Sequence, residues 1–169
     1  YNQDGKYLFS WGESGTGEGQ FNIVHNISTD RDGLVYVADR ENHRVQIFDS
    51  NGKYIDQWIN LSRAACIYID KRGSEDIFYV GEYFSGIASN DTGTNLGPRI
   101  SIFNKKGDLL SRLGVNSYGP SVGRFYSPHG ISVDSKGNIY VAEVSYSDYG
   151  QFLNPKRELR SLQKLVKIS

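Results

Sequence analysis

Two histidines occupy the same place in two copies of one motif. His25 follows Phe21 by four residues, and His129 follows Phe125 by the same interval. Neutral imidazole is a good zinc ligand, and three protein nitrogens with an open fourth position make a Lewis-acid site. An isolated histidine more often forms a local hydrogen bond than binds a metal. The recurrence of histidine at one motif position is what favours a metal site here. Two interpretations stay open for His25 and His129: zinc ligands, or hydrogen bonds to a neighbouring strand.

The motif that carries these histidines is long. Residues 21–39 read FNIVHNISTDRDGLVYVAD and return at residues 125–143 as FYSPHGISVDSKGNIYVAE. A degenerate copy lies between them and has Ala65 at the histidine position. A repeat of about 40 residues built from short strands and Gly/Asp turns is typical of a β-propeller. Equivalent positions of successive blades surround one axis, so the repeat predicts that His25 and His129 lie together on it.

Arg40 is the candidate catalytic residue. The position before it is acidic in every copy of the motif, as Asp39, Glu82 and Glu143. This recurrence predicts a turn-capping function for the acidic residue. Arg40 aligns with Tyr83 and Val144 and therefore lies outside the repeated scaffold. A residue that departs from the scaffold at the end of a strand is a better candidate for a site.

Three other features have ordinary explanations. The turn that contains Asp30 and Asp32 could bind calcium, but hairpin geometry also explains the two carboxylates. His43 lies in a polar turn and is expected to face solvent. Cys66 is the only cysteine, cannot form an internal disulfide and is expected to pack as a small apolar side chain.

The alternation of apolar and polar residues predicts an all-β chain of short strands. In the first copy the strands are expected at residues 22–29, 34–39, 44–48 and 53–58. In the second they are expected from residue 63 and at 99–103 and 108–113, and in the third at 131–133, 138–144 and 162–168. Helix is expected only as a short piece within residues 149–159.

These strands define one partial propeller of about three four-stranded blades. Residues 1–12 are predicted to be the outer strand of a preceding blade, and residues 21–59 a complete blade. Residues 63–114 form a second blade with a loop insertion at 83–98, and residues 125–169 a last blade without its outer strand. Propellers close with four to eight blades. Either missing N-terminal blades or a second copy of the chain would complete a six-bladed ring.

The charge balance concerns two classes of partner, nucleic acids and membranes. The chain has 19 basic and 19 acidic residues among its 169, with no block of either sign. Nothing in this balance indicates a nucleic acid or a membrane as partner.

The motif resembles the NHL repeat, most clearly over residues 19–48. More closely, residues 38–42, 125–130 and 161–166 are similar to the peptidyl-α-hydroxyglycine α-amidating lyase family and its bacterial relatives. That resemblance implies a six-bladed propeller that holds zinc on its axis through three histidines, one from every second blade. It also implies cleavage of a small peptide substrate into the peptide amide and glyoxylate, and an extracellular or periplasmic location.

The resemblance assigns roles to individual residues. His25 and His129 match two of the three zinc ligands, and Arg40 matches an arginine that faces the substrate. The third histidine, the family's catalytic tyrosine and a second arginine would lie upstream of this chain, so low zinc occupancy and little activity are expected from these residues alone. Gly130 and Val24 replace an aspartate and a proline of the family. The alternative function is a non-catalytic NHL-repeat propeller that binds a protein or another ligand.

Overall fold

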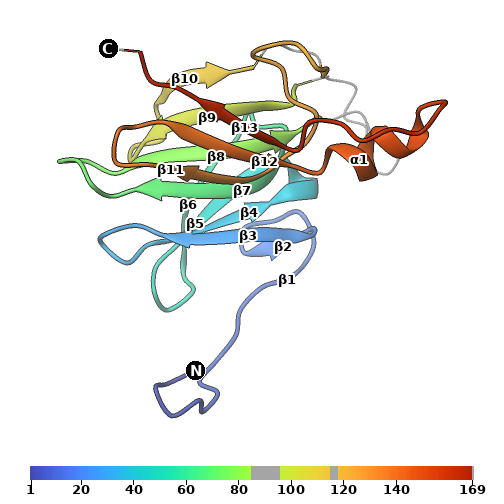
Figure 1. Cartoon of the computed structure of the whole chain (residues 1–169). Helices are drawn as coiled ribbons and strands as arrows, with labels where there is room; N and C mark the ends of the chain where they lie inside the picture. Colours follow the sequence, from blue (N-terminus) through green and yellow to red (C-terminus); the bar gives the residue numbers. More distant parts are fainter. Residues whose placement is uncertain (85–95, 115–117, 169) are drawn as a thin grey trace.

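The computed structural model describes residues 1–84, 96–114 and 118–168. Three antiparallel sheets form the body of the molecule (Figure 1), and each is a propeller blade. The first blade consists of β3 (Val24–Thr29), β4 (Val35–Asp39), β5 (Arg44–Phe48) and β6 (Tyr54–Trp58). The middle blade consists of β7 (Arg63–Asp70), β8 (Ile77–Tyr83), β9 (Arg99–Asn104) and β10 (Leu109–Leu113). The last blade has β11 (Pro128–Val133), β12 (Ile139–Glu143) and β13 (Leu162–Leu165).

The predicted all-β fold is confirmed, with strands close to the expected ranges. Part of the predicted loop insertion, residues 85–95, lies outside the described residues. The helical pieces are η1 (Arg40–Asn42), α1 (Ser145–Asp148) and η2 (Gly150–Phe152). Only η2 lies within the expected range of 149–159. The other two pieces are turns closed soon after a strand: the His43 N–H donates to the Arg40 oxygen after β4, and the Tyr149 N–H donates to the Ser145 oxygen after β12. None of the helices in the described residues is long and apolar enough to span a membrane.

The expectation that residues 1–12 are the outer strand of a preceding blade stays a prediction, because the described residues do not include that blade. Residues 5–11 form no strand, and only the short parallel pair β1 (Glu13–Ser14) and β2 (Gln20–Phe21) precedes the first blade. Trp11 packs against Phe48 of the first blade, with ring centroids 6.1 Å apart, and the chain before it extends away from the blades (Figure 1). An outer strand forms by pairing with the third strand of its own blade, and the described chain has no such third strand before residue 12.

Aspartate and glycine form the turns that connect the first two strands of a blade. In the first blade, Asp30 Oδ1 accepts hydrogen bonds from the N–H groups of Asp32 and Leu34, at 2.9 and 2.8 Å. Gly33 adopts the positive φ of 85° that the tight turn requires. The last blade repeats this turn, with Asp134 as acceptor and Gly137 at φ 81°. The turns therefore fix where each second strand begins.

Aromatic and aliphatic side chains fill the space between neighbouring blades. The Tyr36 ring of the first blade packs against Phe78 of the middle blade with ring centroids 4.6 Å apart, and Trp58 stacks on Phe103 at 5.1 Å. Between the middle and last blades the buried core includes Ile100, Phe125, Val133, Ile139 and Val141. The blades thus share continuous cores, which hold the three innermost strands β3, β7 and β11 beside one another.

The recurrent acidic residues have a different function from the predicted turn cap. All are buried, and each accepts a hydrogen bond from a backbone N–H in the segment that enters its blade: Asp39 from Asn22, Glu82 from Ser62, and Glu143 from Tyr126. Each also accepts from a side chain of the third strand: Gln46, Ser101 and Gln163, respectively. The acidic residue therefore joins the entering segment to the blade.

Candidate metal-binding cleft

A β-bulge occurs at the same point in all three innermost strands. The pairing register shifts between Val24 and Asn26 in β3, between Ala64 and Cys66 in β7, and between Pro128 and Gly130 in β11. The residues inside the bulges are His25, Ala65 and His129. A bulge redirects a side chain and is frequent beside functional sites. The equivalence that the sequence motif predicted is therefore present in the backbone.

The bulges bring the two histidines together. The ring centroids of His25 and His129 are 4.7 Å apart, with an interplanar angle of 69°. His25 Nδ1 lies 2.8 Å from the carbonyl oxygen of Ala65 on the intervening blade. That oxygen can only accept, so Nδ1 carries the hydrogen and Nε2 keeps a free lone pair for a metal. The predicted hydrogen bond to a neighbouring strand is therefore present for His25, and it leaves Nε2 able to bind a metal.

His25 is held in the neutral form. Burial lowers its pKa, the hydrogen bond to Ala65 opposes this, and the positive charge of Arg40 lowers it further. Neutral imidazole is the form that binds metals. The electrostatics of the site therefore favour a His25 that can donate its lone pair near neutral pH.

Two arginines and one carboxylate form one wall of the site. Arg40 lies in η1, directly after β4, and pairs with Glu41 through Nε at 2.7 Å. Arg63, at the start of β7, pairs with the same carboxylate at 2.6 Å. The guanidinium carbons of Arg40 and Arg63 lie 5.8 and 5.4 Å from the centre of the Tyr83 ring. Two cations against one anion leave this wall electropositive.

Tyr83 lies between the arginines and the histidines. Its ring centroid is 6.1 Å from that of His25 and 5.9 Å from that of His129. Burial raises the pKa of Tyr83 to about 12, a hydrogen bond with Ser127 opposes this, and the charge of Asp148 adds to the rise. Ser127 in turn donates its hydroxyl hydrogen to Asp148 Oδ2. Tyr83 therefore stays protonated at neutral pH, and its ring lies beside both imidazoles.

We call this region the axial cleft, and its cavity measures about 460 Å³. Its polar lining residues are His25, Arg40, Arg63, Tyr83, Tyr126, Ser127, His129, Ser147, Asp148 and Tyr149. The comparison of the motif copies within the sequence did not predict Arg63, Tyr83 or Asp148 as site residues. A signal existed for Arg63 and Tyr83, because both depart from the residue types that their equivalents have in the other blades. Asp148 comes from the connection after β12, which has no equivalent in the motif.

Among the described residues, the donor set for zinc is incomplete. In residues 1–84, 96–114 and 118–168, no group of three or more His, Cys, Asp or Glu side chains is placed to hold a metal ion. The imidazoles of His25 and His129 fit a zinc site in chemistry and in proximity, but they provide two ligands where such sites use three or four protein groups.

The other sequence candidates lie elsewhere. Asp30 and Asp32 both pair with Lys105, whose Nζ is 2.9 Å from Asp30 Oδ2, so the two carboxylates already share a cation. His43 was expected to face solvent, but it is half-buried. It is itself the left-handed residue that ends η1 (φ 55°), and the chain continues from it directly into the buried strand β5. Cys66 is buried as expected.

The comparisons with known proteins identify the repeats. Residues 21–48 and 125–147 match the family model for the NHL repeat. Together with the three blades, this match makes the chain an NHL-repeat β-propeller.

Two solved structures show the same fold at low identity. A protein of unknown function from Bacteroides caccae has a TM-score of 0.55 at 14% identity, covering 82% of this chain and 43% of that one. Kuenenia stuttgartiensis hydrazine synthase has a TM-score of 0.50 at 16% identity, covering 96% and 38%.

Relatives by sequence carry different names. Human NHL repeat-containing protein 3 is 46% identical over 34% of this chain and 17% of its own length. The B-box type zinc finger protein ncl-1 of Caenorhabditis elegans is 30% identical over 81% of this chain and 15% of its own. Peptidyl-glycine alpha-amidating monooxygenase B of Xenopus laevis is 26% identical over 97% and 18%. The chain thus spans less than a fifth of each of these curated relatives.

Proposed function

We propose that this chain supplies two ligands of the zinc site of an NHL-repeat lyase, which converts peptidyl-α-hydroxyglycine into the peptide amide and glyoxylate. The observation that supports the proposal most strongly is the contact between His25 and His129, 4.7 Å apart on equivalent bulges of two blades. The similarity to an alpha-amidating enzyme over 97% of the chain supports the same function.

His25 and His129 would hold the metal, and bound zinc supplies a Lewis acid to a substrate oxygen. The other groups of the axial cleft act through charge and hydrogen bonds. Arg40 and Arg63 make one wall electropositive, which favours a substrate that ends in a carboxylate. Asp148 Oδ2, which already accepts the Ser127 hydroxyl hydrogen, is the carboxylate in the cleft lining that can accept a proton. Tyr83, protonated at neutral pH, serves as a hydrogen-bonding group.

A non-catalytic binding propeller is the second candidate. The incomplete donor set among the described residues favours it, and relatives such as ncl-1 carry NHL-type sequence without an enzymatic name. The two candidates differ in whether the axial cleft binds zinc and in whether it releases glyoxylate.

Zinc affinity separates the two candidates. We would titrate the full chain with zinc against a chelator of known affinity, beside the variants His25→Ala and His129→Ala. Each variant should lose more than about tenfold in affinity, since even outer-shell changes cost 10–100-fold. His43→Asn, which changes a histidine that does not line the cleft, is the matched control and should bind like the wild type. Equal zinc binding by all four proteins would contradict the metal site.

Activity is the second readout. The zinc-loaded protein is incubated with a peptide extended by α-hydroxyglycine, and glyoxylate is measured. Zinc-dependent release that His129→Ala abolishes would support the lyase. Zinc binding at His25 and His129 without glyoxylate would support the binding propeller and contradict the lyase.

A further inference from the structure

Aromatic side chains form a second wall of the axial cleft. Besides Tyr83, four aromatic residues line the cleft, and we call them the aromatic wall: Phe84, Tyr126, Tyr149 and Phe152. The rings of Tyr126 and Tyr149 pack against each other with centroids 5.4 Å apart. Pockets that bind small ligands combine such apolar and aromatic surface with a few charged groups. The axial cleft therefore suits a ligand that has both an apolar and a charged part.

The connection between β12 and β13 positions two members of the aromatic wall. The Tyr149 N–H donates to the Ser145 oxygen at 3.0 Å, and the Phe152 N–H donates to the Tyr149 oxygen at 3.0 Å. Gly150 lies between them and is buried, and a Cβ on it would collide with the Arg157 oxygen. Hydrogen bonds and close backbone packing thus hold η2 in place, although the Phe152 side chain is 75% exposed.

The aromatic wall is uncharged near neutral pH. Burial raises the pKa of Tyr149, and the charge of Asp148 adds to the rise, whereas the charge of Arg63 lowers it. The Tyr149 phenol therefore keeps its hydrogen. Tyr149 and Arg63 line the same cleft, so one ligand can touch the aromatic wall and the arginines together.

The charges of the cleft determine which way such a ligand lies. Arg40 and Arg63 share the single carboxylate of Glu41, which leaves an excess of positive charge on their side. Asp148, the carboxylate among the described lining residues, directly precedes Tyr149 in the chain. A ligand carboxylate is attracted by the arginines and repelled by Asp148. The apolar part of the ligand is then left for the aromatic wall.

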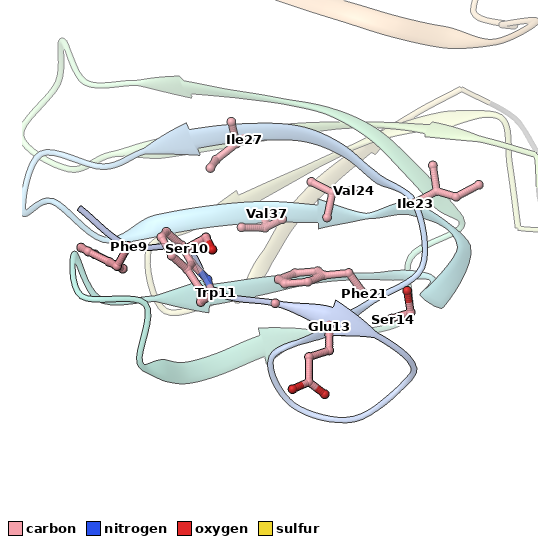
Figure 2. A pocket seen from close by; sticks show the side chains of 11 residues that line it. Phe9, Ser10, Trp11, Glu13, Ser14, Phe21, Ile23, Val24, Ile27 and Val37 are labelled. Carbon is pink, nitrogen blue, oxygen red and sulfur yellow. The ribbon is translucent and has the colours of Figure 1, made fainter. Parts of the chain in front are cut away.

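A second apolar hollow of the molecule lacks this combination. Figure 2 shows Phe9 and Trp11 beside Val24 in that hollow, on the first blade. Among the described residues that line it, the charged one is Glu13, a carboxylate. This hollow would repel a ligand carboxylate, so it offers a comparison in which aromatic surface is present and the basic groups are not.

We propose that the aromatic wall binds the side chain of the residue directly before the C-terminal hydroxyglycine of a peptide, and that it selects a large apolar or aromatic side chain there. The peptide as ligand rests on the proposed function. Its terminal carboxylate pairs with Arg40 and Arg63. The preceding residue is one step of about 3.3–3.6 Å along an extended chain, and its side chain is the first that can reach a different wall.

The proposed selectivity has a physical cause in the wall. An aromatic ring that packs against Tyr149 and Phe152 leaves water and forms ring contacts, which stabilise the complex beyond the burial of area. A methyl group at the same position makes few of these contacts. The wall should therefore distinguish peptides by the residue before the last, while the arginines bind the carboxylate that all of them share.

Peptide binding without turnover tests this subsite. N-acetyl-phenylalanyl-glycine and N-acetyl-alanyl-glycine lack the hydroxyl group and are not cleaved, so NMR titrations of the full chain give a dissociation constant for each. The wild type should bind the phenylalanyl peptide about tenfold more tightly, as expected for partial burial of a large apolar side chain. Phe152→Ala should reduce this preference to about threefold or less, because half of the ring contacts are lost. Phe9→Ala, the same substitution in the hollow of Figure 2, is the matched control and should keep the full preference.

Equal affinities of the two peptides for the wild type would overturn the subsite, as would a preference that Phe152→Ala leaves unchanged. The absence of binding at the solubility limit of the phenylalanyl peptide would overturn it too. The amide of this peptide should bind more weakly than the acid, and equal binding would overturn the assigned orientation. The proposed function fails separately, through the absence of glyoxylate from the hydroxyglycine peptide while the preference for the phenylalanyl peptide persists.

Discussion

The sulfur of Cys66 fills the space that a side chain on Gly81 would need. A Cβ built on Gly81 would lie 2.5 Å from Cys66 Sγ and 3.2 Å from Ile131 Cδ1 of the last blade. Cys66 and Gly81 are paired residues of β7 and β8. The equivalent pairs in the other blades are Asn26 with Ala38 and Gly130 with Ala142. The middle blade therefore combines a thiol on its inner strand with the smallest residue opposite.

This packing predicts that Gly81→Ala lowers the free energy of unfolding by about 1–3 kcal/mol, the usual cost of overpacking a core. The loss should be smaller when Cys66→Ala has first removed the sulfur. Urea unfolding of the wild type, both single variants and the double variant gives the coupling energy. An equal cost of Gly81→Ala in both backgrounds would show that the thiol does not limit the space.

The Glu41 carboxylate should contribute strongly to stability. It is 7% exposed and joins Arg40 to Arg63, which is 6% exposed. Glu41→Gln leaves a buried guanidinium without its counter-charge, and such losses cost about 3–5 kcal/mol. Urea unfolding should detect this loss, whereas Glu75→Gln at an exposed position should change little. Similar curves for the two variants would contradict a stabilising role for the Glu41 pairs.

Asp134 should make stability depend on pH. Hydrogen bonds, first from the Asn138 side chain and also from the Lys136 and Asn138 N–H groups, lower its pKa from 3.8 to about 2. A lowered pKa stabilises the folded state above pH 4, and this contribution is lost as the pH falls towards 2. Asp134→Asn should therefore be less stable than the wild type at pH 6, with a gap that narrows below pH 4.

Chemical unfolding at several pH values measures this gap, with the exposed Glu158→Gln as control. A gap between Asp134→Asn and the wild type that stays constant from pH 6 to pH 3 would contradict the assignment.

The sequence was sufficient to predict the blades and the position of both histidines. Asp-Gly turns and alternating strands are local features, and the bulges that carry His25 and His129 recur at a fixed motif position. Arg63 and Asp148 were not predicted to join them, because their places depend on how neighbouring blades pack and on the connection after β12. The capping function proposed for Asp39 was wrong, since its partners include a segment 17 residues earlier in the chain. Such a contact has no local signal.

Residues 5–11 form no strand, for a different physical reason. Their sequence predicts an outer strand, but a strand forms only when a neighbour satisfies its hydrogen bonds. Among the described residues, no third strand of the same blade lies beside this segment, so its backbone forms no strand although its sequence predicts one.

Anomalous scattering from crystals grown with zinc tests the central claim most directly. Data collected on both sides of the zinc absorption edge should show a peak about 2 Å from ring nitrogens of both His25 and His129. His25 Nδ1 should still donate to the Ala65 oxygen, so that Nε2 is the ligand. A zinc peak that avoids the axial cleft, or a cleft without a peak at saturating zinc, would contradict the claim that these two histidines form a metal site.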